Sequence, residues 1–225
     1  MHSSGQAGPA SGLMNVSADL AQSVAAGLGI REMPTPMPKV LTRDVAPEVS
    51  VSPALSLFAR PGDGSIRTRR VAILVADGCD GAALATLADR LTSEGAVPRF
   101  VSATLGSVQA AAGDAIEVDV SLQAAPAVLY DALVLLDGDD AISALRADGR
   151  TLEFIKDQYR HCKPILALGP GKELLDACGI DATSQDGKPD AGLIIASNAS
   201  AGADDFVAAI AKHRHFARET DPPRV

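Results

Sequence analysis

The chain has 225 residues, of which 47% are hydrophobic and 21% charged, and its formal net charge is -8 at pH 7. The excess of acidic residues argues against nucleic acid or an anionic membrane surface as a partner. No apolar run approaches the roughly 18 residues of a membrane-spanning helix, and the start lacks a signal-peptide pattern. The three cysteines, an odd number, favour free thiols in a reducing cytoplasm, so we expect a cytoplasmic protein.

Three segments precede the first predicted strand. Residues 1–11 are interpreted as a tag or a disordered segment. Residues 12–30 predict an amphipathic helix that Ser17 caps, with apolar residues at four-residue spacing. These apolar residues are Leu20, Val24 and Leu28. A helix this short is only marginally stable alone. Its apolar stripe therefore either packs against the main domain or has its partner surface outside this chain. Residues 31–66 are rich in proline and predict an extended linker.

Residues 67–218 alternate between strand and helix patterns, and residues 219–225 read as a tail. Continuous apolar runs predict strands at 71–76, 97–101, 132–136, 163–168 and 192–196. Helices are expected around Leu84–Leu91, which Asp80 caps, around Leu152–Tyr159, and from Asp204 and Asp205 onward; residues 106–120 predict a short edge hairpin. This alternation predicts an α/β fold, a flavodoxin-like doubly wound parallel sheet with helices on both faces.

Residues 163–172 resemble the junction at which α/β enzymes display a nucleophile, because an apolar strand ends in a Gly-Pro-Gly turn before a helix. The apex here is Ala167 or Leu168, and neither can attack a substrate. A phosphate-loop interpretation fails as well. Leu166 stands where that motif needs its first glycine, and Glu173 stands where it needs Ser or Thr.

Acidic residues follow the first and third predicted strands: Asp77, Asp80, Asp137, Asp139 and Asp140. Carboxylates that converge there could bind magnesium, with Asp137 accepting a phosphoryl group as in a receiver domain. Against this hypothesis, no adjacent acidic pair follows the first strand. The alternative is that these residues are solvated loop acids and helix caps.

Cys79 is the one thiol with a candidate role. It lies between a predicted strand and a helix whose N-terminus would favour the thiolate, although no His lies near it in sequence. Cys162 and Cys178 are interpreted as structural. His213 and His215 are two apart on a predicted helix, so they point to different sides and cannot share a metal ion.

Several segments resemble the C-terminal domain of large-subunit haem catalases. They are 52–57, 69–78 and 161–169, while 19–29 resembles the segment that links the catalase body to that domain. No single motif is diagnostic, but the order and spacing of the segments together carry the resemblance.

That domain is similar to the DJ-1/PfpI and class I glutamine amidotransferase superfamily, whose sheet is flavodoxin-like. Active members carry a Cys-His-Gly-Pro elbow after a strand. When Gly169 and Pro170 are aligned with its last two residues, the Cys and His positions fall on Ala167 and Leu168. The supporting acid would fall near Ala83. All three positions are apolar, so the resemblance implies a site that has lost its chemistry.

The resemblance therefore implies a non-catalytic, excised domain of a catalase that decomposes hydrogen peroxide. Its expected role is to stabilise or assist folding of the parent homotetramer, with chaperone-like holding of unfolded client proteins as a further expectation. The expected partner is the catalase body, which would carry the haem, and this chain would hold no cofactor or metal. The alternative is a DJ-1/PfpI-like thiol enzyme or redox-sensitive protein that uses Cys79.

Overall fold

The computed structural model describes residues 7–40, 43, 46, 48–56, 59, 62–183, 187–220 and 222–225. The chain divides into two compact units, Met1–Ser56 and Leu57–Val225. Each unit is described on its own below.

The first unit contains two short helices, α1 (Ala7–Leu13) and α2 (Ala18–Gly27). The hydroxyl of Ser17 caps α2 by accepting a hydrogen bond of 3.3 Å from the backbone N–H of Leu20. The chain leaves the helix through Gly29, whose φ is 70°. Helix α2 thus lies within residues 12–30, for which the sequence predicts an amphipathic helix. Alanines form the buried contact between the two helices: Ala10, Ala21 and Ala25.

The sequence pattern does not predict α1, whose first five residues fall in the segment interpreted as a tag or disordered. Pro9 lies in its first turn, where the missing N–H costs no helical hydrogen bond. Small alanines, rather than a periodic apolar stripe, hold α1 and α2 together. The predicted stripe of α2 stays largely outside this contact, because Leu20 is 45% exposed and Leu28 is 42% exposed.

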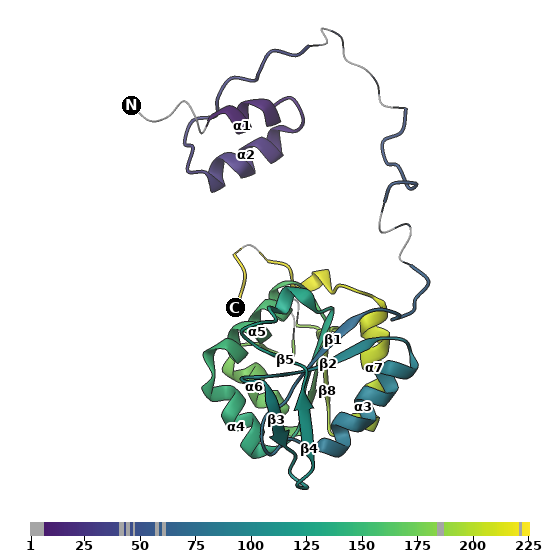
Figure 1. Cartoon of the computed structure of the whole chain (residues 1–225). Coiled ribbons are helices and arrows are strands. Elements are labelled where there is room, and N and C mark those ends of the chain that lie inside the picture. The colour runs from purple at the N-terminus through teal and green to yellow at the C-terminus, as the bar shows by residue number, and fades with distance from the viewer. Residues whose placement is uncertain are drawn as a thin grey trace. The chain divides into compact units, whose positions relative to one another are not determined.

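The second unit is built on a six-stranded parallel sheet in the order β5-β2-β1-β6-β7-β8 (Figure 1). Its strands are β1 (Arg70–Leu74), β2 (Val97–Ser102), β5 (Val120–Ser121), β6 (Ala132–Leu135), β7 (Ile165–Leu168) and β8 (Leu193–Ala196). Without the short β5, the strand order is the flavodoxin-like one. Strand β2 lies on one side of β1, and β6, β7 and β8 follow on the other side, so the topological switch point lies between β1 and β6. The predicted fold class is confirmed.

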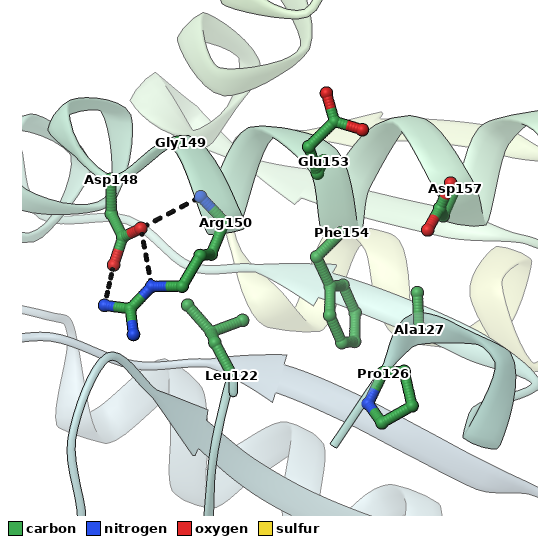
Figure 2. A pocket seen from close by; sticks show the side chains of 9 residues that line it. All are labelled: Leu122, Pro126, Ala127, Asp148, Gly149, Arg150, Glu153, Phe154 and Asp157. Atoms are coloured by element: carbon green, nitrogen blue, oxygen red, sulfur yellow. Dashed lines mark hydrogen bonds and ion pairs between the residues drawn. The ribbon is translucent and has the colours of Figure 1, made fainter. Parts of the chain in front are cut away.

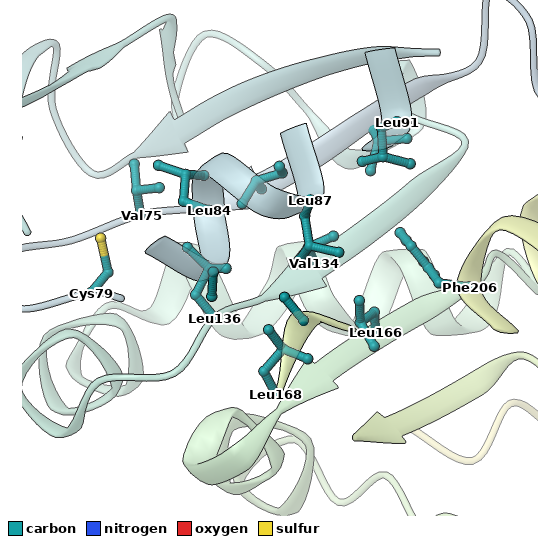
Figure 3. Packing of buried hydrophobic residues seen from close by; sticks show 14 of the residues in the cluster. Val75, Cys79, Leu84, Leu87, Leu91, Val134, Leu136, Leu166, Leu168 and Phe206 are labelled. Atoms are coloured by element: carbon teal, nitrogen blue, oxygen red, sulfur yellow. The ribbon is translucent and has the colours of Figure 1, made fainter. Parts of the chain in front are cut away.

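Helices cover both faces of this sheet (Figure 1). On one face lie α3 (Gly81–Ser93) and α7 (Ala199–Ala211). On the other lie α4 (Asp139–Ala147), α5 (Gly149–Arg160) and α6 (Lys172–Ala177). Strands β6 and β7 are buried at every position, as their continuous apolar runs predict. Figure 3 shows the packing under α3 and α7, where Leu84, Leu87 and Leu91 meet Val134, Leu166 and Phe206.

The remaining elements are short. The predicted hairpin is confirmed as β3 (Gly106–Gln109) and β4 (Ala115–Val118), which form a separate antiparallel pair. The described residues of the unit also form three 3₁₀ turns: η1 (Ala127–Leu129), η2 (Gly169–Gly171) and η3 (Phe216–Arg218). Among the described residues, none of the helices is both long enough and apolar enough to cross a membrane.

Helix α7 begins earlier than predicted. Asn198 caps it by accepting a bond from the backbone of its first turn, and the helix starts at Ala199 rather than at Asp204 and Asp205. A Cβ on Gly202 would lie 2.8 Å from side chains of β7 and β8. The first turns of α7 therefore need small residues for close packing on the sheet, and a search for large apolar residues overlooks them.

Two other local predictions are wrong. Asp139 and Asp140 form the first turn of α4 instead of a loop after β6. Acidic residues suit that place, because the N-terminus of a helix favours negative charge. His213 and His215 lie beyond the end of α7 rather than on it.

Candidate functional site

The carboxyl ends of β1 and β6 lie where the strand order reverses, which is where ligands bind in sheets of this kind. The turns that follow these strands touch there through their backbones. The backbone N–H of Asp80 donates to the carbonyl of Asp137 at 3.0 Å. A Cβ on Gly138, whose φ is 127°, would lie 2.2 Å from the carbonyl oxygen of Gly78. The bottom of the crevice is therefore closed by the protein's own backbone.

The predicted apex residues Ala167 and Leu168 lie inside β7, with exposures of 0% and 1%. The corner between strand and helix is Gly169 instead, which has the positive φ of 47°. A Cβ there would lie 2.7 Å from Oδ2 of Asp137. The place where a nucleophile would project is thus taken by a carboxylate, and the corner residue has no side chain to offer.

The position of the missing acid, Ala83, lies in the first turn of α3, where its backbone N–H donates to Oδ1 of Asp80 at 3.0 Å. Ala83 and Leu168 face the apolar cluster under α3 and α7. Ala167 faces the cluster on the opposite side of the sheet. The three apolar positions therefore do not converge on one solvent-accessible point.

Cys79 is fully buried among Val75, Leu84 and Leu136 (Figure 3). Burial raises the pKa of its thiol, and the nearby carboxylates of Asp80 and Asp77 raise it further. Burial and these charges therefore oppose the thiolate that the sequence argument expects at Cys79.

The β3–β4 hairpin covers this region. The backbone N–H of Gly78 donates to Gln109 O at 2.8 Å, and Ala111 N–H donates to Cys79 O at 2.9 Å. The carboxylate of Asp77 accepts a third bond, of 2.8 Å, from the backbone N–H of Gln109. The hairpin is thus fastened over the turn that carries the thiol.

We expect Cys79 to react with a thiol reagent at least about 100-fold more slowly in the folded chain than in the unfolded chain, because reaction requires local opening. A Cys162→Ala/Cys178→Ala variant leaves it as the only cysteine, so the measurement is a labelling rate in buffer and in denaturant. Ser93→Cys, at an exposed site, in place of Cys79 is the control and should label rapidly in both conditions. Rapid labelling of folded Cys79 would contradict the burial and revive the thiol-enzyme hypothesis.

A pocket of about 560 Å³ remains above the closed crevice, between the β1–α3 turn and the β3–β4 loop. Three carboxylates line it: Asp80, Asp114 and Asp137. Oδ1 of Asp80 caps α3, and Oδ1 of Asp137 accepts a 2.6 Å bond from the N–H of Gly138. In the part of the chain that the structure describes, no three His, Cys, Asp or Glu residues could together hold a metal ion. These bonds support the interpretation of the acids as caps and turn residues.

Sequence reasoning overlooked Asp114 and the hairpin loop as part of this pocket. The sequence predicts a hairpin over residues 106–120 but not the position of its turn. Its position over Cys79 depends on backbone hydrogen bonds that leave no pattern in the side chains.

A second pocket, of about 520 Å³, lies beside the first turns of α5 (Figure 2). Phe154 projects toward Pro126 on its apolar side, while Asp148 binds Arg150 at 2.6 Å on its rim. None of the nine residues that line it is Ser, Thr, Cys, His or Lys. This pocket therefore offers no hydroxyl, thiol or amine nucleophile.

The end of the sheet at which the parallel strands begin, here called the amino edge, holds buried charges that the sequence does not reveal. Lys163 is 2% exposed, and its Nζ donates to the carbonyl oxygens of Ala127 at 2.9 Å and Val128 at 3.4 Å. Burial lowers the pKa of Lys163 to about 8, with a further contribution from the charge of Arg214. No carboxylate is hydrogen-bonded to this ammonium within the described residues, so its charged form destabilises the fold.

We expect the stability of the chain relative to a Lys163→Met variant to rise with pH between about 8 and 10.5. In this window the unfolded chain binds a proton at Lys163 that the folded chain does not, so raising the pH removes a cost of folding. The relative gain should be about 3 kcal/mol. Urea unfolding of both proteins at neutral pH and at the upper limit measures it. Lys172→Met, at an exposed residue paired with Asp176, is the control. If the stability difference from the unmodified chain were independent of pH for both variants, the prediction would be wrong.

Comparison with known proteins gives the family. Residues 67–220 match the family described as the C-terminal domain found in long catalases. A catalase HPII of Mycobacterium avium is 35% identical over 218 residues, which cover 93% of this chain and 30% of that protein. A catalase HPII of Pseudomonas putida is 34% identical over 208 residues, covering 92% of this chain and 27% of that protein. The chain thus spans less than a third of the length of these relatives.

The fold also resembles a solved ThiJ/PfpI family protein from Pseudomonas syringae. The TM-score is 0.55 at 22% identity, and the match covers 79% of this chain and 78% of that protein. This likeness supports the flavodoxin-like fold and nothing more specific. By the match over residues 67–220 and the identity to the two relatives, the chain belongs to the family of C-terminal domains found in long catalases.

Proposed function

We propose that this chain is a non-catalytic part of a long catalase and that it stabilises the assembled homotetramer or assists its folding. The observation that carries the proposal is the corner at Gly169, where Asp137 fills the space that a nucleophile would need. The buried thiol of Cys79 supports it, because it offers no relocated nucleophile. Peroxide decomposition and the haem would then belong to the part of the polypeptide outside this chain.

The test is to produce the long catalase with and without residues 67–220 and to measure its assembly state by sedimentation. We expect the shortened protein to form fewer tetramers or to dissociate at higher protein concentration. Equal assembly at every concentration would count against a role in assembly. Peptidase, glyoxalase or deglycase activity in the isolated chain, lost in Cys79→Ala, would replace the proposal by its thiol-enzyme rival.

A chaperone-like activity is a second candidate, and exposed apolar residues on and beside α2 favour it. Val16, Leu20 and Leu28 are 76%, 45% and 42% exposed, so they could hold apolar segments of an unfolded chain. We expect the chain to slow thermal aggregation of a client protein and Leu20→Ser/Leu28→Ser to lose this effect. Gln22→Ser, at an exposed polar residue of the same helix, is the matched control. If the unmodified chain gave no protection, this candidate would be wrong, and the proposed role in assembly would be unaffected.

A cytoplasmic location is part of the same proposal. The three free cysteines support it, because unpaired thiols are usual in a reducing compartment.

A further inference from the structure

Three residues other than glycine adopt a positive φ within the described part of the chain. They are Thr68 at 64°, Cys162 at 57° and His213 at 67°. Each is followed directly by a cationic residue: Arg69, Lys163 and Arg214. All six lie at the amino edge of the sheet, because Arg69 and Lys163 precede β1 and β7, and Arg214 follows α7. Each of these three cations is therefore directly preceded by a residue with a strained backbone.

This conformation is unfavourable for these residue types. Threonine is β-branched, so Thr68 is a genuine outlier in the left-handed region. Cys162 and His213 lie just after the C-caps of α5 and α7, where glycine is the usual residue. Backbone strain that persists is often found at functional sites. The three positions retain side chains where glycine would relieve the strain.

Arg69 and His213 meet at one carboxylate, Asp131, which also lies within electrostatic range of Arg214 and Lys163. Nη1 of Arg69 lies 3.3 Å from Oδ1 of Asp131, and Nε2 of His213 lies 3.8 Å from the same oxygen. The other carboxylate oxygen accepts a 3.0 Å bond from the backbone N–H of Arg70. Asp131 is thereby fixed in place, and the side chains of Arg69 and His213 remain 33% and 46% exposed. The cluster can be reached from solvent.

Positive charge exceeds negative charge at this point of an acidic chain. Burial lowers the pKa of Arg214; the Asp131 carboxylate opposes this effect, and the charge of Arg69 adds to it. Burial lowers the pKa of His213 too, and the charges of Arg214 and Arg69 lower it further. Asp157 also lies within electrostatic range of Lys163, but its carboxylate is bound by Arg160 at 3.3 Å. Asp131 thus lies near the positive charges of Arg69, Arg214 and Lys163, and the neutral form of His213 is favoured beside it.

We propose that Arg69, His213 and Arg214, arranged around Asp131, form a binding site for an oxyanion, either a phosphate or a carboxylate group. Arginine forks match both groups in geometry. Arg69 gives Nη1 to Asp131 and Arg214 gives Nη1 to the His213 carbonyl, and within the described residues neither has another side-chain hydrogen bond. Both therefore retain N–H donors for a ligand.

Cations are also common at helix C-termini, where they stabilise the helix dipole. That explanation fits Arg214, which follows α7, but not Arg69, which follows no helix. Nor does it explain why Cys162 and His213 replace the usual glycine. The site is independent of the proposed role in catalase assembly.

The test is a titration of the full chain with inorganic phosphate, and separately with succinate, at constant ionic strength set with chloride. We expect saturable shifts of the imidazole resonances of His213 with at least one of the two probes. Arg69→Gln and Arg214→Gln should each weaken binding at least about tenfold, because each removes a charged fork. Asp131→Asn should tighten it, because the competing carboxylate is gone. Arg146→Gln, at an exposed arginine 4.0 Å from Glu173, should leave binding unchanged.

The responses to the two probes identify the ligand. Saturation by phosphate alone assigns a phosphate site, and saturation by succinate assigns a site for carboxylates such as acidic side chains. Shifts that do not saturate with either probe, or equal losses in Arg146→Gln, would overturn the proposal. His213→Gly separates binding from structure: its unfolding midpoint should be unchanged or higher, since glycine accepts the positive φ, while binding becomes several-fold weaker. A lower midpoint with unchanged binding would show that His213 serves the fold alone.

Discussion

Replacing Arg218 by methionine is expected to lower the free energy of unfolding by about 3–5 kcal/mol, because it leaves a buried carboxylate without its partner. The side chains of Arg218 and Asp190 are 1% and 3% exposed, and Nε of the arginine lies 2.6 Å from Oδ2 of the aspartate. Nη1 of Arg218 also donates to the carbonyl of Lys163 at 2.6 Å. Its guanidinium lies 4.9 Å from the ring centre of Tyr159. Chemical denaturation measures the loss.

Two further variants isolate the ion pair as the cause. The double variant Asp190→Asn/Arg218→Met should be more stable than Arg218→Met by at least about 1 kcal/mol, because no unpaired charge remains buried. Asparagine can still accept the 2.8 Å bond that the backbone N–H of Gly192 gives to the aspartate. Arg146→Met should change stability by less than about 0.5 kcal/mol, because its ion pair with Glu173 is exposed. Equal effects of the Arg218 and Arg146 variants would contradict the prediction.

Gly138→Ala is expected to destabilise the chain by about 3 kcal/mol or more, from overpacking and backbone strain together. Its φ is 127°, and the new Cβ would lie 2.2 Å from the carbonyl oxygen of Gly78 and 3.0 Å from the Cα of Cys79. Both neighbours are backbone atoms, so neither can rotate away. The two turns that close the crevice would have to separate.

Gly113→Ala is the matched control for this variant. Its φ is 95° and a Cβ there would meet nothing within 4 Å, so it carries the backbone strain without the contact. We expect it to cost about 1–2 kcal/mol, which is the strain alone. If Gly138→Ala cost no more than Gly113→Ala in chemical denaturation, the turns would not be in the close contact described above.

The sheet could be predicted from the sequence, because strands buried on both faces are written as continuous apolar runs. This holds for β1, β6 and β7, and Asp80 caps α3 as its place before the helix predicts. The start of α7 could not be predicted in this way, because close packing on the sheet demands small residues there. Periodic large apolar residues mark a helix only where large side chains fill the space between the helix and the sheet.

The absence of the elbow's Cys and His was visible in the sequence, but the geometry of the turn was not. Apolar residues at Ala167 and Leu168 already indicate an empty elbow. Alignment on Gly169 places the nucleophile two residues earlier, inside β7, whereas the backbone turns at Gly169 itself. That difference depends on a single φ value and on where Asp137 lies, and neither leaves a sequence pattern.

The amino edge shows a second limit of sequence reasoning. Asp131 is 62 residues from Arg69 along the chain and still farther from His213. Only the parallel sheet brings the three residues together. Arg218 and Asp190 likewise meet through the fold. Charged residues of this kind read as ordinary surface residues until the topology is known.

The most direct measurement of the proposed role is the rate at which peroxide decomposition is lost on heating. Three proteins would be compared: the long catalase that carries this chain, the same protein without residues 67–220, and its Arg218→Met variant. We expect equal initial turnover in all three, because the proposal assigns the chemistry to the part outside this chain, and faster inactivation of the shortened and Arg218→Met proteins. Equal half-lives for all three proteins, or turnover abolished at once when residues 67–220 are removed, would contradict a purely stabilising, non-catalytic domain.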